Sequence, residues 1–287
     1  MPCRPMAAAP LQELLQHGIT PLMIHPEPIR PPGPGRPPSL MSRVVDGILN
    51  LIYPESCVVC SVPVARAQDR GVCPGCRQKL QLQRITGSLC PCCGLPFPSL
   101  ATESPHLCGP CILHPPPYSG ARAFGRYSAE LSRIIQAFKF SGRRNLASIL
   151  APLLASTLQE SWSLREVDLI VPVPLNPKRR RARGYNQAWL LARDLAGLVG
   201  LPCRHDALRR VRHTPPQVGL SDAERARNLK HAFRCAKPAA VRGLHVLLID
   251  DVMTTGSTAA SAAEALLQGG ALRVSVLTLA RAVADPE

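Results

Sequence analysis

Two sets of four cysteines have the spacing expected of metal ligands. Each set consists of two pairs, and two residues separate the cysteines within a pair. The first set is Cys57, Cys60, Cys73 and Cys76, and the second is Cys90, Cys93, Cys108 and Cys111. Four thiolates in two tight turns suit the tetrahedral Zn²⁺ of a closed structural site, which leaves no coordination position open for catalysis. We therefore predict two structural zinc ions.

This prediction has two alternatives: a different cysteine as a zinc ligand, and disulfides in place of zinc. Cys92 could replace Cys93 as a ligand, although the two-residue spacing of the other pairs favours Cys93. Disulfides are the alternative to zinc. The opening segment MPCRPMAAAPLQELLQHG carries prolines and Glu13 where a signal peptide needs an unbroken apolar stretch. We therefore expect a cytoplasmic protein, in which thiols stay reduced and paired cysteines usually bind metal.

A second motif has the composition of a phosphate-binding turn. The segment VLLIDDVMTTGST runs from Val246 to Thr258 and predicts a buried strand, two carboxylates, a hydroxyl-rich turn and the start of a helix. Free N–H groups and the helix dipole favour an anion at such a place. The residues predicted to contribute are Asp250, Asp251, Thr254, Thr255, Gly256, Ser257 and Thr258. The carboxylates would repel phosphate, so we assign them to ribose hydroxyls, with Mg²⁺ nearby. The alternative is an ordinary helix N-cap with two solvated acids.

Periodicity predicts the elements that must position this turn. Apolar runs and alternation predict strands at 121–127, 167–173, 246–249 and 274–279. Helical spacing predicts helices at 146–159, 186–199 and 257–268, and a further helix after Ser128 with the apolar stripe Leu131, Ile134, Ile135 and Phe138. Strands separated by helices predict an α/β fold, a parallel sheet with helices on both faces.

Composition divides the chain into three parts. Residues 1–40 hold 11 of the 31 prolines and predict a disordered tail, because proline supports neither a helix nor a sheet ladder. Residues 41–116 contain both cysteine sets, and 117–287 contain the predicted sheet. No apolar run approaches the ~20 residues that cross a bilayer, so we expect no membrane span.

Positive charge is concentrated in one stretch. The net charge is +15, and Pro174–Cys235 contributes 14 Lys/Arg against 4 Asp/Glu. This excess is more than one diphosphate requires. It predicts either a solvated charged face or a track for single-stranded DNA, with Tyr185 or Trp189 as stacking platforms.

Several segments together resemble a known family. VLLIDDVMTTGST resembles the phosphoribosyl-pyrophosphate signature of type I phosphoribosyltransferases. The resemblance continues in VPVP at 171–174, RGYNQ at 183–187 and AFK at 137–139. Combined with two zinc ribbons, the chain resembles the ComF family, which is associated with late competence and DNA uptake.

This resemblance implies a fold, a ligand and site residues. It implies a type I phosphoribosyltransferase-like domain that binds phosphoribosyl pyrophosphate, preceded by a small double zinc-ribbon domain. The pyrophosphate would lie against Val173, Pro174, Lys178 and Arg179, under a cover that includes Arg183, Gln217, Arg225 and Asn228. Lys139 is either a further anion contact or a solvated lysine at a helix end.

The resemblance leaves the biochemical role open between three possibilities. The first is a DNA-uptake factor, for which a helicase-like competence ATPase is an implied partner. The second is an active, amidophosphoribosyltransferase-like enzyme, although the chain carries no recognisable acceptor motif. The third is a zinc-ribbon regulator that senses a nucleotide.

Overall fold

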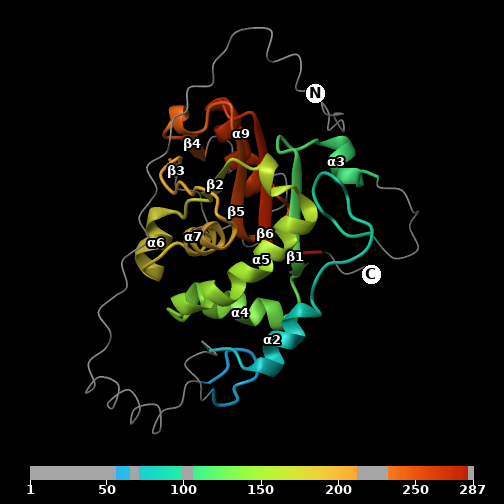
Figure 1. Ribbon diagram of the computed structural model, residues 1–287, viewed down its shortest axis with the longest axis vertical. Helices are drawn as coiled ribbons and strands as arrows, with labels where there is room; N and C mark the ends of the chain where they lie inside the picture. Colours follow the sequence, from blue (N-terminus) through green and yellow to red (C-terminus); the bar gives the residue numbers. More distant parts are fainter. Residues whose placement is uncertain (1–55, 65–70, 98–105, 212–231, 284–287) are drawn as a thin grey trace.

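The protein is built around a four-stranded parallel sheet (Figure 1). The computed structural model describes residues 56–64, 71–97, 106–211 and 232–283. The strand order is β1-β6-β5-β2. The strands are β1 (Gly120–Arg126), β2 (Leu169–Pro172), β5 (His245–Met253) and β6 (Arg273–Arg281). The α/β fold class predicted from the sequence is therefore confirmed, whereas the predicted tail at 1–40 lies outside the described residues.

Helices cover both faces of this sheet. The helices α4 (Ala129–Phe140), α5 (Ala147–Ser161) and α7 (Gln187–Val199) pack on one face. The opposite face packs against α9 (Ser257–Gln268) and a two-stranded antiparallel sheet of β3 (Leu208–Arg210) and β4 (Phe233–Cys235). The remaining helices are α2 (Pro74–Gln81), α3 (Gly109–Leu113) and α6 (Pro177–Arg183), with short 3₁₀ turns at Arg144–Leu146, Leu164–Glu166 and Pro238–Ala240. No helix of the described segments combines the length and apolarity needed to cross a membrane.

The alternation of side chains along β5 explains how one strand serves two cores. Leu247 and Ile249 point into the core shared with α4, α5 and α7, while Val246 and Leu248 point into the core shared with α9. All four are fully buried, as expected for a central strand of a parallel sheet.

The helix α4 follows its predicted pattern closely. The hydroxyl oxygen of Ser128 accepts a hydrogen bond from the backbone N–H of Leu131, which caps the helix. The predicted apolar stripe is fully buried: Leu131, Ile134, Ile135 and Phe138 each have 0% exposure. These residues place the polar C-terminal end of α4 beside the carboxyl edge of the sheet.

Two differences from the prediction affect the edge of the sheet where the carboxyl ends of the strands lie. The strand predicted to end at Ile249 continues to Met253, because β6 runs alongside it and pairs Asp250 with Thr278 and Val252 with Ala280. The segment after β2, predicted to be a loop as far as Arg179, is a loop only to Asn176. Asn176 accepts a hydrogen bond from the Lys178 N–H and begins α6, with Pro177 in the first helical turn.

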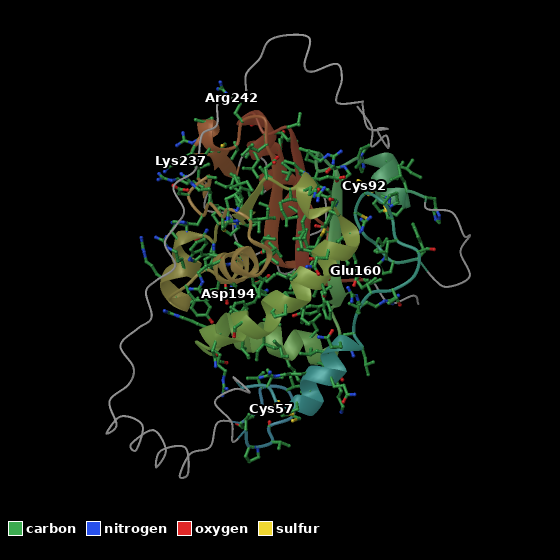
Figure 2. The ribbon with its side chains drawn as sticks, viewed as in Figure 1. Cys57, Cys92, Glu160, Asp194, Lys237 and Arg242 are labelled. Atoms are coloured by element: carbon green, nitrogen blue, oxygen red, sulfur yellow. The ribbon has the colours of Figure 1, made fainter. Side chains whose placement is uncertain are left out.

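The two cysteine sets belong to different cores. Cys57 and Cys76 pack in the same core as α4 and α5, while the second set packs in the core of α9 and β5. Figure 2 shows Cys57 and Cys92 at widely separated places on the molecule. Each cysteine segment therefore packs against the sheet domain. The predicted domain boundary between residues 116 and 117 stays a prediction.

Candidate functional site

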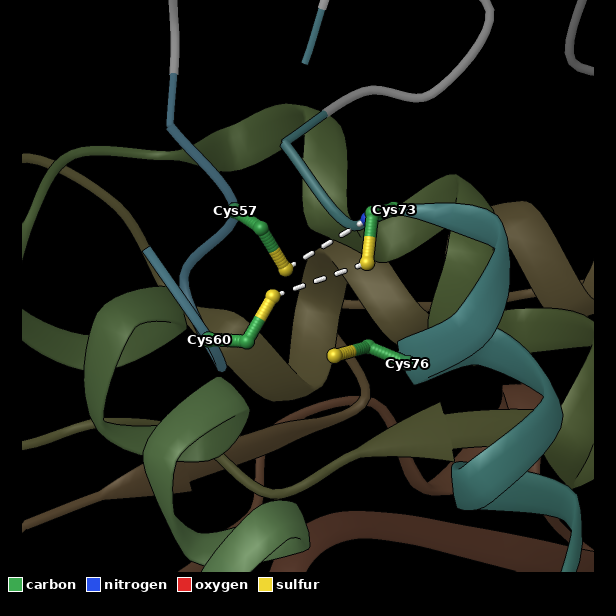
Figure 3. Close-up of side chains that lie close together, drawn as sticks. All are labelled: Cys57, Cys60, Cys73 and Cys76. Atoms are coloured by element: carbon green, nitrogen blue, oxygen red, sulfur yellow. Dashed lines mark hydrogen bonds between the residues drawn. The ribbon is translucent and has the colours of Figure 1, made fainter. Parts of the chain in front are cut away.

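The described cysteine segments form two clusters of four sulfur atoms. Within each cluster the Sγ atoms all lie within 4.8 Å of one another. The Cys60–Cys73 sulfurs are 3.6 Å apart and the Cys93–Cys108 sulfurs 3.5 Å. Zn–S bonds of about 2.3 Å in a tetrahedron require sulfurs about 3.8 Å apart, so both clusters fit zinc. Figure 3 shows the four thiol groups of the first cluster pointing toward a common centre.

The two clusters are built as structural repeats. In each, a backbone N–H from the second cysteine pair donates to a sulfur of the first pair: Cys73 to Cys57, and Cys108 to Cys90, both at 3.4 Å. Burial alone would raise the pKa of the Cys57 thiol, but backbone N–H donors hold it at about 6. Cys57 is thus stabilised as a thiolate, the form that binds a metal ion, whereas burial raises the pKa of the Cys76 thiol in the same cluster.

The structure distinguishes Cys93 from Cys92. Cys93 belongs to the second cluster, whereas Cys92 does not. The Cys92 carbonyl instead accepts a hydrogen bond from Ala121 N–H at 2.7 Å, which joins the cysteine segment to β1. Gly94, at φ +67°, makes this approach possible, because a Cβ there would lie 2.4 Å from the Ala121 carbonyl oxygen.

A buried arginine supports a metal in the second cluster. Arg281, at 7% exposure, donates from Nη2 to the Cys93 sulfur at 3.8 Å. Its Nε and Nη1 atoms are buried and have no hydrogen-bond partner in the described part of the chain. A guanidinium in this position needs nearby negative charge, and a zinc ion with four thiolates carries a net charge of −2. The donor set and its surroundings therefore fit zinc.

A cavity of about 540 Å³ lies at the carboxyl edge of the sheet. All four strands contribute to it: Tyr127 follows β1, Val173 follows β2, Asp250 lies in β5, and Ala282 follows β6. The full lining is Tyr127, Lys139, Val173, Pro174, Leu175, Arg179, Arg183, Asn186, Gln187, Ala188, Arg210, Asp250, Asp251, Val252, Thr254, Thr258 and Ala282. This edge is where ligands bind in open parallel sheets.

The two acids of β5 and a lysine of α4 meet in this cavity. Lys139 Nζ lies 3.0 Å from Asp251 Oδ1, and these side chains are only 18% and 14% exposed. Lys139 is therefore not a solvated lysine at a helix end. Burial and the Asp251 carboxylate raise the pKa of Asp250 to about 7, while Lys139 acts in the opposite direction. The cavity thus holds a carboxylate pair with a cation beside it.

The predicted phosphate turn forms the start of α9. Gly256, at φ +84°, caps the helix, and Thr255 Oγ1 lies 2.8 Å from Ser257 Oγ. Thr254 and Thr258 line the cavity, whereas the other three residues of the turn do not. Hydroxyl groups and the helix N-terminus therefore face the same space as the acid pair.

Cations surround the acid pair. Arg179, Arg183 and Arg210 line the cavity with Lys139, whereas Lys178 is exposed and lies outside the lining. Burial lowers the pKa of Arg210, and the nearby Arg179 guanidinium lowers it further. Arg210 was not among the predicted site residues. The signal that could have placed its side chain on an inner face is its spacing of two residues from the buried Leu208, because such residues of a strand share a face.

Family models match both parts of the chain. A double zinc ribbon domain matches residues 48–112, and a phosphoribosyl transferase domain matches residues 183–287. The DNA utilization protein YhgH of Salmonella typhimurium is 40% identical over 236 residues, which cover 80% of this chain and 99% of that protein. The chain belongs to the ComF/YhgH family.

Other relatives carry competence names. Competence protein F of Haemophilus influenzae is 34% identical over 79% of this chain and 96% of its own length. Competence protein ComFC of Bacillus subtilis is 31% identical over 74% of this chain and 85% of its own length. The family resemblance stated from the sequence is therefore confirmed, and the zinc-ribbon match together with the two cysteine clusters supports structural zinc.

Part of the predicted ComF-family site lies outside the described residues. Gln217, Arg225 and Asn228, predicted to cover the cavity, fall in this group. The described residues Val211 and Ala232 are joined by a hydrogen bond from the Val211 N–H to the Ala232 carbonyl at 2.8 Å. Val211 directly follows Arg210, which lines the cavity.

The predicted stacking platforms are not both available. Tyr185 is 8% exposed, and its hydroxyl donates to the Phe138 carbonyl, so its prediction as a platform is wrong. The reason is that Tyr185 anchors the start of α7 against α4. Trp189 is half-buried, and its ring centroid lies 4.7 Å from that of His205.

Proposed function

We propose that the cavity at the carboxyl edge of the sheet binds phosphoribosyl pyrophosphate. The observation that carries this proposal is the convergence of the Asp250–Asp251 pair, the hydroxyl-bearing start of α9 and four cationic side chains on one cavity. Phosphoribosyl pyrophosphate has two anionic ends joined by a ribose with free hydroxyls. An acid pair between two anion-binding regions is complementary to that arrangement of groups.

Each part of the ligand has a matching group. Asp250 and Asp251 accept hydrogen bonds from ribose hydroxyls, and the turn from Thr254 to Thr258 receives the 5′-phosphate. The diphosphate lies by Val173 and Pro174, where Arg179 and Arg210 neutralise charge. A Mg²⁺ ion bound with the diphosphate would supply further charge neutralisation.

Lys139 joins this set as a positioning residue. It holds the Asp251 carboxylate at 3.0 Å and reduces the repulsion between the two acids. Because α4 packs on the first cysteine cluster, with Arg133 donating to the Val59 carbonyl at 3.1 Å, that cluster supports the helix that presents Lys139.

We also propose that the protein handles single-stranded DNA in the cytoplasm during DNA uptake. Its relatives are named for DNA utilization and competence. The surface next to the cavity is strongly basic: Lys178, Arg179, Arg180 and Arg181 of α6 are all exposed. Exposed cations in excess of what one ligand requires suit a polyanion whose affinity depends on salt.

Calorimetric titration of the zinc-loaded chain with phosphoribosyl pyrophosphate and Mg²⁺ tests the ligand assignment. Wild type should bind, and Asp250→Ala/Asp251→Ala should lose binding. The matched control is Glu166→Ala/Asp194→Ala, which removes the same charge outside the cavity lining and should bind like wild type. Equal affinity in all three proteins, or no binding by wild type, would refute the proposal.

The second candidate is catalysis in the same cavity, and the donor-side groups already described favour it. In that reaction the bond between ribose C1 and the diphosphate breaks, and an acceptor nucleophile forms the new bond to C1. Diphosphate release measured with ammonia, with purine bases and with no acceptor separates an enzyme from a binding protein. Release that depends on an acceptor would show a transferase, and bound ligand that is recovered intact in every case would rule one out.

A further inference from the structure

An exposed aromatic ring lies beside the basic helix. Phe140, the last residue of α4, is 65% exposed, although Phe138 two positions earlier is fully buried. The Arg183 guanidinium lies over the Phe140 ring, 4.6 Å from its centroid. A phenyl ring held in solvent next to a guanidinium presents a flat apolar surface with positive charge at one side.

The ring lies at the end of a basic helix. Arg183 ends α6, whose preceding residues Lys178 to Arg181 are exposed to solvent. Arg144, on the other side of the α6–α7 turn, donates to the Gly184 carbonyl at 3.3 Å and lies 5.1 Å from the Tyr185 ring centroid. The exposed ring therefore contacts the last residue of a helix whose exposed basic side chains attract phosphate groups.

We propose that Phe140 and Arg183 form a stacking platform for a base of single-stranded DNA whose phosphates lie along α6. The combination favours a single strand, because duplex bases are already stacked and cannot lie flat on a protein ring. It favours nucleic acid over other polyanions, because a phenyl ring adds nothing to the binding of phosphate alone. This inference rests on the proposed DNA-handling function, and not on the occupancy of the phosphoribosyl cavity.

The platform adjoins the cavity through a shared residue. Arg183 lines the cavity, and its guanidinium also lies over the Phe140 ring. Its Nη1 donates to Gln187 Oε1 at 3.2 Å. A strand bound along α6 therefore passes the rim of the cavity. The geometry differs from the platforms predicted from sequence, since Tyr185 is buried beneath this surface.

Fluorescence anisotropy of the zinc-loaded full chain tests the platform. The probes are a labelled oligothymidylate of about 15 nucleotides and an abasic strand of the same length, at one fixed ionic strength. Phe140→Ala should weaken oligothymidylate binding about fivefold to one-hundredfold, the effect expected from losing one stacked base. Phe140→Tyr should retain binding. Abasic-strand affinity should be unchanged in every Phe140 variant.

Two controls separate stacking from charge and from general surface effects. Leu272→Ala removes an apolar side chain that is 75% exposed at the opposite, amino edge of the sheet, and should bind like wild type. Arg180→Ala should reduce the slope of log affinity against log salt by about one unit, while Phe140→Ala should leave that slope unchanged.

The outcomes are distinct from those of the cavity test. Phe140→Ala within twofold of wild type on oligothymidylate, or equal losses on the abasic strand, would overturn the platform. Wild type that binds no oligothymidylate at low salt would overturn the DNA function itself. In both cases the titration with phosphoribosyl pyrophosphate stands separately, because Phe140 is not part of the cavity lining.

Discussion

Replacing Lys139 by methionine tests whether the cavity depends on the cation beside its acid pair. At 3.0 Å and an effective dielectric constant of about 20, the Lys139–Asp251 attraction is ~5 kcal/mol before the cost of desolvation. Both side chains are largely but not wholly buried, so the net contribution lies between those of surface and fully buried pairs, about 1–3 kcal/mol. Phosphoribosyl pyrophosphate is a polyanion, and losing this cation should weaken its binding about 5-fold to 100-fold.

The same substitution should change the dependence of binding on pH. The pKa of Asp250 is raised to about 7 by burial and by Asp251, and Lys139 partly offsets this. Binding that uses the ionised carboxylate therefore weakens as the pH falls through about 7. Without Lys139 the pKa of Asp250 rises further, so the midpoint of this loss should move to higher pH.

Calorimetric titrations from about pH 5.5 to about pH 9 measure both effects. This range extends about 1.5 units or more on each side of neutrality. Lys178→Met is the matched control, since Lys178 is exposed and outside the cavity lining. It should leave the affinity and the midpoint unchanged, and Lys139→Arg should restore much of both. If Lys139→Met binds with wild-type affinity and an unshifted pH midpoint, ligand binding does not depend on the Lys139 cation.

Three further predictions concern zinc, packing and the acid pair. Cys111→Ser should lower the zinc content measured by atomic emission from two equivalents to about one. It should also lower the melting temperature, because a structural zinc contributes an apparent ~10–16 kcal/mol. Two retained equivalents of zinc would contradict this prediction. Gly94→Ala should destabilise the fold by more than ~2 kcal/mol in thermal denaturation, because its Cβ would meet the Ala121 carbonyl. The control is Gly75→Ala in α2, whose Cβ would lie in open space, and it should be neutral or stabilising. Asp250→Asn should raise the melting temperature of the ligand-free protein at pH 8 yet abolish ligand binding. A carboxyl whose folded pKa is raised stabilises the fold at low pH, and this stabilisation is lost as the pH rises through that pKa; an unchanged melting temperature would count against it.

Local sequence signals predicted much of the fold. The stripe of α4 and its Ser128 cap follow from helical spacing alone, and α9 spans the predicted 257–268. These elements could be predicted because their caps and apolar faces are encoded within a few neighbouring residues.

Features that depend on distant pairing were not predictable in the same way. The extension of β5 through Asp250 and Asp251 requires β6 alongside it, since acids seldom favour a strand by themselves. The β3–β4 pair joins three-residue strands on either side of a segment of some 20 residues, which is too little local pattern to detect.

The candidate site likewise combines residues that the local sequence predicted with residues whose positions depend on packing between distant elements. The cysteine spacing identified both clusters, and the segment VLLIDDVMTTGST contains Asp250, Asp251, Thr254 and Thr258, which line the cavity. The assignment of its turn to phosphate stays a proposal. The burial of Lys139 and the inward position of Arg210 depend on how α4 and β3 pack against the sheet. The exposure of Phe140 and the burial of Tyr185 likewise follow from the α4–α7 contact and not from either local sequence.

The most direct test of the phosphoribosyl assignment is a crystal structure of the zinc-loaded protein grown with saturating phosphoribosyl pyrophosphate and Mg²⁺. We expect the 5′-phosphate within hydrogen-bond distance of the turn from Thr254 to Thr258, and the ribose hydroxyls on Asp250 and Asp251. Ligand bound elsewhere on the protein, or a cavity that stays empty at saturation, would contradict it.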